Sequence, residues 1–265
     1  MSDVDKYMGL MDQGLAPLGN DVTANLKPIV WALFQMVYKD LEKAIVCNPV
    51  EHHLIVLKHM MEIVKGEMSP YIVVEQAAAL ALLHDIAPVK KITTQMVDQT
   101  RHRSTAMGEV FELKRQENRM LHMQEGCVIA NLRMIELNER MRKIVFDAQS
   151  IQSICEVIRI HDNPSINISI PKTNWLAVAF READRLWMIT PEGIYADLSR
   201  QQKSNNMEAY RKQLDANLER FREERLLYRS IESIEGPFCD DATFFRTKTG
   251  YSLYRRLLDL GKKKD

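Results

Sequence analysis

The chain has 265 residues, enough for one large domain or for one domain with an appended lobe. Apolar residues make up 46%, charged residues 27%, and the formal net charge is zero, which argues against a general nucleic-acid or membrane binder. The first residues, MSDVD, do not resemble a signal peptide, and no window approaches roughly 18 uncharged apolar residues. We therefore expect a cytoplasmic protein without a membrane span.

Apolar residues recur at steps of three and four along most of the chain, whereas β-branched alternation is rare, so the sequence predicts an all-α fold. Pro28 suits a first helical turn, Gly66 is expected to end the next helix, and Thr173 or Asn174 is expected to cap a later one. Helices are expected over 28–46, 50–65, from 69 to the mid-chain pair His84-Asp85, over 119–142, over 148–161 and through 175–187.

Residues 87–117 lack this periodicity and are polar and basic. A loop of this length inside a compact domain is usually functional or mobile, and we expect the same here.

Beyond Pro191 the composition changes, and an apolar stripe at helical spacing runs from Met207 to Tyr228 among dense charge. The stripe can dock on the core of its own chain or on a second subunit, which would make a homodimer, and we expect docking within one chain. A short helix from Tyr251 is expected to follow.

Four cysteines are scattered without CxxC spacing. We expect free thiols in a reducing compartment rather than disulfides or a zinc cluster. They are Cys47, Cys127, Cys155 and Cys239.

The apolar run from Ala77 to Leu83 ends abruptly in His84 and Asp85. Burying both polar groups costs several kcal/mol unless they are paired or bound to a cation. The pair is therefore a candidate for metal binding.

Other potential ligands stand at helix ends or on apolar faces. His52 and His53 compete for one role, and Asp184 could instead pair with Arg181 or Arg185. His59 and His102 have no companion features and are expected to be surface or core histidines. The further candidates, each of which could also be a capping or surface histidine, are His122 and His161.

Together these residues resemble the HD-domain superfamily of metal-dependent phosphohydrolases: a histidine, then His-Asp about thirty residues later, then a distant aspartate. The phase of the first motif selects His52 over His53. The resemblance covers roughly residues 45–190. The matching motifs are Glu51-His52-x-x-x-Val56, Ala78-x-Leu80-Ala81-Leu82-Leu83-His84-Asp85-Ile86, His122-x-x-Glu125-Gly126, Ile158-x-x-His161 and Ala183-Asp184-Arg185-Leu186.

The resemblance implies an HD-domain-like helical bundle over 48–190, with an N-terminal helical segment over 1–47 and a C-terminal helical extension over 191–265. It implies that His52, His84, Asp85 and Asp184 bind a first divalent cation, whereas His122 and His161 hold a second, with Asp85 bridging and catalytic. This mixed nitrogen and oxygen set suits Mn, Fe, Co, Ni or Zn. Both extra histidines are present, which favours two ions per chain that activate a water to attack phosphorus.

A basic segment beside the metal of a neutral protein suggests an anionic, small phosphorylated substrate. Ala87 and Pro88 stand where many two-metal relatives have glycine and lysine. Because of these two departures from the family pattern, the substrate class of those relatives cannot be transferred to this chain. The candidate substrate-binding cations are Lys90, Lys91, Arg101, Arg103, Lys114 and Arg115, and Arg133 and Arg159 could serve likewise or be surface charges.

The expected function is metal-dependent hydrolysis of a phosphate ester or nucleotide. One alternative is a di-iron oxygenase, since some superfamily members use the same six ligands with two irons to activate dioxygen. The other alternative is a non-catalytic, nucleotide-binding regulatory protein that keeps the fold.

Overall fold

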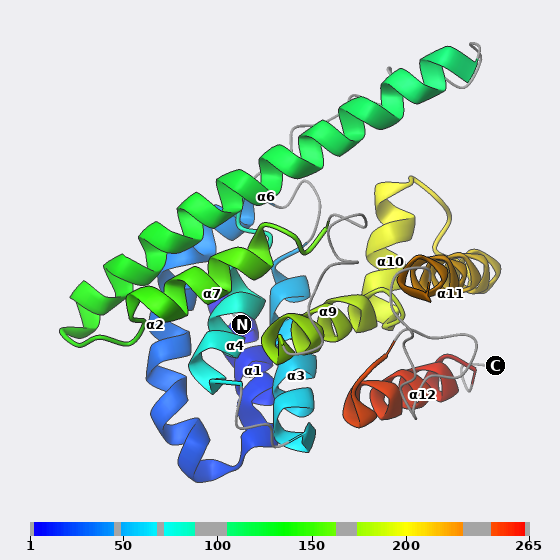
Figure 1. The fold of residues 1–265 in the computed structure, drawn as a ribbon. Helices are drawn as coiled ribbons and strands as arrows, with labels where there is room; N and C mark the ends of the chain where they lie inside the picture. The colour runs from blue at the N-terminus through cyan, green and yellow to red at the C-terminus, as the bar shows by residue number, and fades with distance from the viewer. Residues whose placement is uncertain are drawn as a thin grey trace.

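The computed structural model describes residues 3–44, 49–67, 72–87, 105–162, 174–229 and 245–262. All regular elements in these ranges are helices, which confirms the predicted all-α fold class (Figure 1). No helix of the described ranges is long and apolar enough to cross a membrane. The elements are α1 (Asp3–Leu15), the 3-10 helix η1 (Ala16–Leu18), α2 (Asn20–Ala44), α3 (Val50–Glu67), α4 (Val74–Leu83), α6 (Thr105–Met141), α7 (Ala148–Ile158), α9 (Trp175–Trp187), α10 (Pro191–Arg200), α11 (Met207–Arg229) and α12 (Lys248–Lys262).

Helix α3 lies inside the bundle and packs against α1, α4 and α9 (Figure 1). Buried residues occur on all its sides, as expected of a helix that other helices surround. Helix α4 is buried from Ala77 to Leu83, and its small alanines allow neighbouring helices to approach closely. The His-Asp pair at the end of α4 therefore lies inside the protein.

Helix α2 begins two turns earlier than predicted. It starts at Asn20, directly after Gly19 ends η1 with φ of 83°, and Pro28 lies inside it. An interior proline removes one backbone hydrogen bond and disfavours a helix, which is why the prediction began at this residue. Burial of Leu26 and Val30 against the core offsets that cost.

The long helix α6 also begins earlier than predicted, at Thr105 instead of near residue 119. Its first turns carry Met107, Val110 and Phe111 at helical spacing, but Gly108 and the charged residues around them obscure this short pattern. Helix α7 then packs back against α6. The turn between them is held by Asn138, whose Oδ1 accepts hydrogen bonds from the backbone N–H groups of Val145 (2.8 Å) and Phe146 (2.9 Å).

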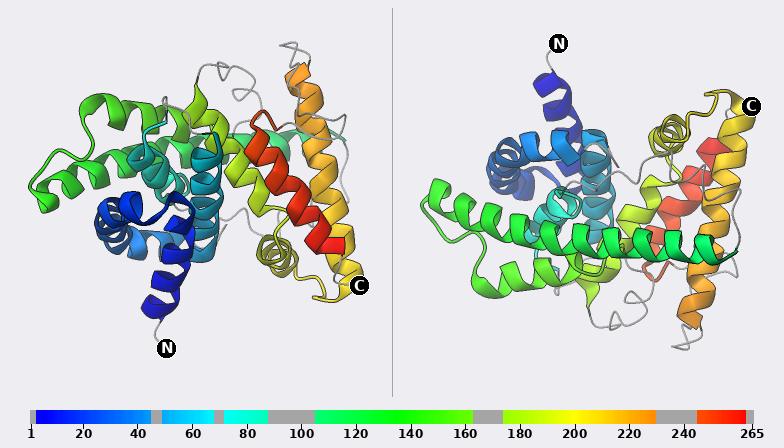
Figure 2. Two further views of the ribbon diagram at one scale, coloured as in Figure 1. Left: turned by 90° about the horizontal axis from the view of Figure 1, so that it is seen from below. Right: turned by 90° about the horizontal axis from the view of Figure 1, so that it is seen from above.

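The C-terminal helices dock on their own chain, as predicted for the apolar stripe of α11. Tyr210 packs with Ile194 and Leu198 of α10, and Phe221 lies 6.3 Å from the ring of Phe245, centroid to centroid. Figure 2 shows α12 between α9 and α11. Leu226 and Leu227 at the end of the stripe lie outside the described side chains.

Gly66 does not end α3, which continues to Glu67. It instead makes room for the start of α12: a Cβ at this position would lie 2.2 Å from Thr249 Oγ1. The predicted stop is therefore wrong, and the glycine serves a tertiary contact.

Two of the four cysteines, Cys127 and Cys155, are free and buried, as expected. Burial, together with the neighbouring Cys127, raises the pKa of Cys155 to about 12, so this thiol stays protonated. Cys47 and Cys239 lie outside the described residues. One core cluster includes residues from Met11 to Tyr254, and the segment boundaries proposed above at residues 48 and 191 stay predictions.

Candidate metal centre

Side chains far apart in the sequence converge in the middle of the bundle. Their helices meet there because α3, α4 and α9 pack directly on one another, α7 packs on α4, and α6 packs on α7. The six residues are His52 in the first turn of α3, His84 and Asp85 at the end of α4, His122 in α6, His161 just after α7, and Asp184 in α9.

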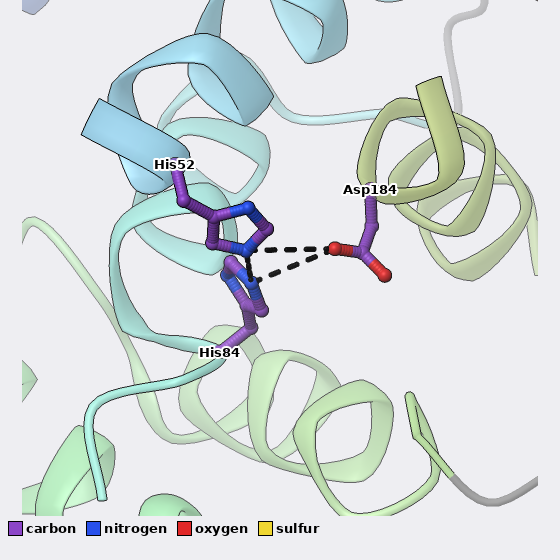
Figure 3. A group of neighbouring side chains, drawn as sticks. All are labelled: His52, His84 and Asp184. Atoms are coloured by element: carbon purple, nitrogen blue, oxygen red, sulfur yellow. Dashed lines mark hydrogen bonds and ion pairs between the residues drawn. The ribbon is translucent and has the colours of Figure 1, made fainter. Parts of the chain in front are cut away.

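The first group consists of His52, His84 and Asp184, whose ligand atoms face one another in Figure 3. The Nε2 atoms of His52 and His84 lie 2.8 Å apart, and they lie 3.6 Å and 3.8 Å from Asp184 Oδ1. Nitrogen and oxygen ligands about 2.0–2.2 Å from a shared ion are separated by roughly 3–3.5 Å. The spacing of these three ligand atoms therefore suits a single shared metal ion.

The second group consists of Asp85, His122 and His161. Both imidazole Nε2 atoms lie 3.0 Å from Asp85 Oδ1. The other carboxylate oxygen, Asp85 Oδ2, lies 3.6 Å from Nε2 of His52 and of His84. The aspartate therefore presents one oxygen to each group of histidines.

Backbone carbonyls orient two of the histidine rings. His84 Nδ1 lies 3.1 Å from the carbonyl oxygen of Ala81, and His161 Nδ1 lies 2.7 Å from that of Ile158. A carbonyl can only accept, so each Nδ1 is a protonated donor and Nε2 of each ring faces the centre. This orientation leaves Nε2 as the atom through which either histidine would bind a metal.

Local structure places the His-Asp pair. His84 is the C-cap residue of α4 with helical angles, φ −60° and ψ −40°, and its N–H still bonds to the carbonyl of Leu80. The chain turns directly afterwards, so Asp85 lies at the helix end. His84 is fully buried, whereas the side chain of Asp85 is 15% exposed. The centre is thus more open to solvent at Asp85.

The electrostatics of the centre favour an ionised aspartate beside neutral rings. Burial, and then the neighbouring His84 and His53, hold the pKa of His52 well below its usual value. Burial also lowers the pKa of His84, against the opposing effect of Asp85. Burial disfavours an ionised Asp85, but His84 and the hydrogen bonds from His122 and His161 hold the pKa of Asp85 well below its usual range.

His161 behaves differently from His52 and His84. Burial disfavours its charged form, but the hydrogen bond with Asp85 outweighs this and raises the pKa of His161 to about 9. Without a metal, a proton at His161 therefore balances the charge of Asp85. A cation bound there would replace that proton.

Of the two neighbouring histidines of α3, only His52 belongs to a group of potential ligand atoms. His53 is buried with its ring centroid 5.0 Å from that of His84, but it belongs to neither group of ligand atoms. His59 is also a core residue and lies 3.1 Å from Glu62. His102 lies outside the described residues.

Asp184 lies beside both sets of partners considered for it. Its Oδ1 faces the first group, while its Oδ2 accepts a hydrogen bond of 2.7 Å from Arg185 Nη1. The arginine thereby fixes the orientation of the carboxylate.

Two aromatic residues of the centre escaped the sequence analysis. The Phe180 ring lies 5.0 Å from His84 and 6.1 Å from His161, and the Trp187 ring lies 5.1 Å from His52. Their signal is spacing: they stand four residues before and three after Asp184, on the same face of α9. They form an apolar wall behind the imidazoles.

The predicted substrate-binding cations are not tested by the described part of the chain. Lys90, Lys91, Arg101 and Arg103, and the side chains of Lys114 and Arg115, lie outside it.

Arg133 and Arg159 do not point to a role at the centre, because one is paired with acidic residues elsewhere and the other is exposed. Arg133 binds Asp40 of α2, with Nη2 to Oδ2 at 2.6 Å, and it also pairs with Glu136. Arg159 is exposed. Both are therefore better described as structural and surface charges, which was the second of the two readings considered.

Gly126 lies against the centre from α6. A Cβ there would meet Ile158 Cγ2 at 3.5 Å and the carbonyl oxygen of His84 at 3.6 Å, which is ordinary contact. The helix does approach its neighbours closely at this point, but an alanine would also fit.

Comparison of the chain with protein-family models, with curated proteins and with solved structures found no match. What can be concluded about the centre comes from its own geometry: each of the two His/Asp groups could hold a metal ion.

Proposed function

We propose that the protein is a metal-dependent phosphohydrolase of the HD type, which hydrolyses a phosphate ester or a nucleotide with a metal-activated water. The observation that carries the proposal is the position of Asp85, with one carboxylate oxygen 3.0 Å from two histidines and the other 3.6 Å from two more. A carboxylate between two sets of imidazoles is the arrangement expected of a ligand that bridges two cations.

The chemistry of the donors supports two divalent ions. Four imidazoles and two carboxylates converge, and such a mixed set suits Mn, Fe, Co, Ni or Zn better than Mg or Ca. His52, His84 and Asp184 would hold the first ion, and His122 and His161 the second, with Asp85 shared. Because these groups are largely buried, leaving them without a counter-charge would be costly.

Bound cations of this kind lower the pKa of a water molecule toward ~7 and offset negative charge on phosphoryl oxygens. The chain's own residues prepare the site for that chemistry. The carbonyls of Ala81 and Ile158 hold two imidazoles in the ligating tautomer, and Arg185 holds Asp184. The wall of Phe180 and Trp187 excludes water from one side, which strengthens the electrostatic interactions inside.

The assay is metal analysis of the purified protein followed by phosphate release from a panel of nucleotides and sugar phosphates. We expect two divalent ions per chain and metal-dependent hydrolysis. Asp85→Ala is expected to abolish metal binding and hydrolysis together while helical content stays nearly unchanged, because Asp85 lies beyond the end of α4. Asp215→Ala, an exposed aspartate of α11, is the matched control and should behave like wild type.

Metal-dependent hydrolysis that persists in Asp85→Ala would refute the proposal. Two tightly bound irons together with oxygen consumption and no phosphate release would favour a di-iron oxygenase. Nucleotide binding without turnover of any substrate would favour a regulatory protein.

A further inference from the structure

The C-terminal helix α12 contacts the two helices that carry His52 and Asp184, two members of the first group. Helix α3 carries His52, helix α9 carries Asp184, and α12 packs against both of them. Figure 2 shows α12 along α9, on the side of the molecule away from α2.

The contact with α9 is made by a buried carboxylate. Glu182, only 2% exposed, accepts hydrogen bonds from the backbone N–H groups of Arg246 and Thr247 and from the Thr247 hydroxyl. Thr247 Oγ1 in turn accepts a hydrogen bond of 2.8 Å from the N–H of Gly250 and so caps α12. One threonine therefore links the start of α12 to α9.

The contact with α3 is made by two further carboxylates. Glu67 Oε1 accepts a hydrogen bond of 2.8 Å from the N–H of Thr249, and Glu62 Oε1 accepts one of 2.8 Å from Arg256 Nη2. We name this set of contacts the α12 clamp; it consists of Arg246, Thr247, Thr249 and Arg256 on one side and Glu62, Glu67 and Glu182 on the other.

Two glycines show how little slack the α12 clamp has. A Cβ on Gly66 of α3 would lie 2.2 Å from Thr249 Oγ1, and one on Gly250 of α12 would lie 2.1 Å from Glu182 Oε2. Both distances are far below contact, so a side chain at Gly66 would displace Thr249 and one at Gly250 would displace the carboxylate of Glu182 from its hydrogen bonds.

The geometry of α9 connects the α12 clamp to the metal ligand. Successive residues of a helix are rotated by about 100°, so Glu182 and Asp184 project roughly 200° apart, on nearly opposite sides of α9. Asp184 faces His52 and His84, and Glu182 faces α12. The α12 clamp thus holds α9 from behind at the turn that presents Asp184.

We propose that the α12 clamp is a positioning device for the first group of the centre: Thr247, through Glu182, sets the distance between Asp184 and His52. This inference rests on the proposed function. The second group is drawn from α4, α6 and the turn after α7, none of which contributes to the clamp, so loosening the clamp acts selectively on the first group.

The test measures Mn2+ binding by calorimetric titration of the full chain in a His122→Ala background, in which the first group remains. Thr247→Val removes the hydroxyl at nearly constant volume and should weaken Mn2+ binding by up to about tenfold, the lower end of the effect of direct hydrogen-bond partners of metal ligands, because Thr247 acts through Glu182. Thr247→Ser keeps the hydroxyl and should restore the affinity. Ser252→Ala is the control on α12, since its exposed hydroxyl bonds only to the carbonyl of Lys248.

Thermal unfolding separates positioning from simple stabilisation. A lower Tm of Thr247→Val with unchanged Mn2+ affinity would overturn the inference and leave the proposed function intact. If Thr247→Val does not fold, Arg256→Ala replaces it; that side chain is 55% exposed, and its loss should weaken Mn2+ binding a few-fold. Unchanged affinity in Arg256→Ala would then overturn the inference. Absence of Mn2+ binding by the wild-type chain would instead overturn the proposed function, and the inference with it.

Discussion

Gly66→Ala is expected to destabilise the protein, although alanine is normally the better helix former. The residue lies in the last turn of α3, where the start of α12 crosses it. A Cβ at this position would lie 2.2 Å from Oγ1, 2.7 Å from Cγ2 and 2.9 Å from Cβ of Thr249. Both branches of that side chain are in the way, and rotation about χ1 leaves Thr249 Cβ in place at 2.9 Å, so it does not relieve the overlap.

Relief requires α12 to move away by about 1 Å, since ordinary contact begins at 3.4 Å. The hydrogen bond of 2.8 Å from Thr249 N to Glu67 Oε1 would then be broken or badly stretched. A hydrogen bond to a charged group contributes about 1.5–3 kcal/mol. Replacing a helical glycine by alanine increases stability by up to about 1 kcal/mol, because alanine has the higher helix propensity. The net effect is a loss of stability of about 0.5–2 kcal/mol.

The assay is chemical and thermal unfolding followed by circular dichroism, with Gly9→Ala as the matched control. Gly9 lies inside α1 with nothing within 4 Å of an added Cβ, so its replacement should stabilise the protein by about 0.5–1 kcal/mol. The two substitutions should therefore have opposite signs, and each kcal/mol should shift Tm by about 2–4 °C. Equal stabilisation by both would refute the close contact between α3 and α12.

Two further predictions concern acid stability and metal stoichiometry. Burial disfavours the charged form of Glu62, but its hydrogen bonds with His59 and Arg256 outweigh this and lower its pKa to about 2 from 4.5. The stabilising effect of ionised Glu62 should therefore be complete above about pH 4.5 and be lost as the pH falls toward 2. In unfolding titrations, the difference in free energy of unfolding between wild type and Glu62→Gln should shrink over that pH range. A difference that does not depend on pH would contradict the assignment. His122→Ala should reduce the bound divalent ions from two to one per chain, because it removes a ligand of the second group only; one ion in both proteins, by metal analysis, would refute a binuclear centre.

The residues themselves marked only part of the centre: His84 and Asp85 end an apolar helix and so stand out as buried polar groups. The choice of His52 over His53 came from the resemblance to the family motif, since both histidines are buried in α3. The aromatic wall was not within reach, since Phe180 and Trp187 look like ordinary core residues of α9 until the imidazoles are placed beside them. Glu182 was missed for the same reason: its partners are 64 and 65 residues further along the chain.

The errors in the fold have a similar origin. Pro28 disfavours a helix locally, yet α2 passes through it because packing of the surrounding apolar residues outweighs one lost hydrogen bond. The first turns of α6 carry only a short apolar set, Met107, Val110 and Phe111, within a segment of charged residues that also contains Gly108. In both cases a local feature of the sequence, the proline or the charged segment, argued against a helix that the fold contains.

By itself the sequence determined the helical class, because periodicity and helix-end chemistry are local properties, whereas the set of six candidate ligands came from the resemblance to a family pattern. Only the tertiary structure decided that Asp85 turns one oxygen to each group, that Thr247 binds Glu182 on the side of α9 opposite Asp184, and that Gly66 lies against α12. Such features depend on how closely and at what angle helices pack, and helix packing is set by the sum of many side-chain contacts along the whole chain.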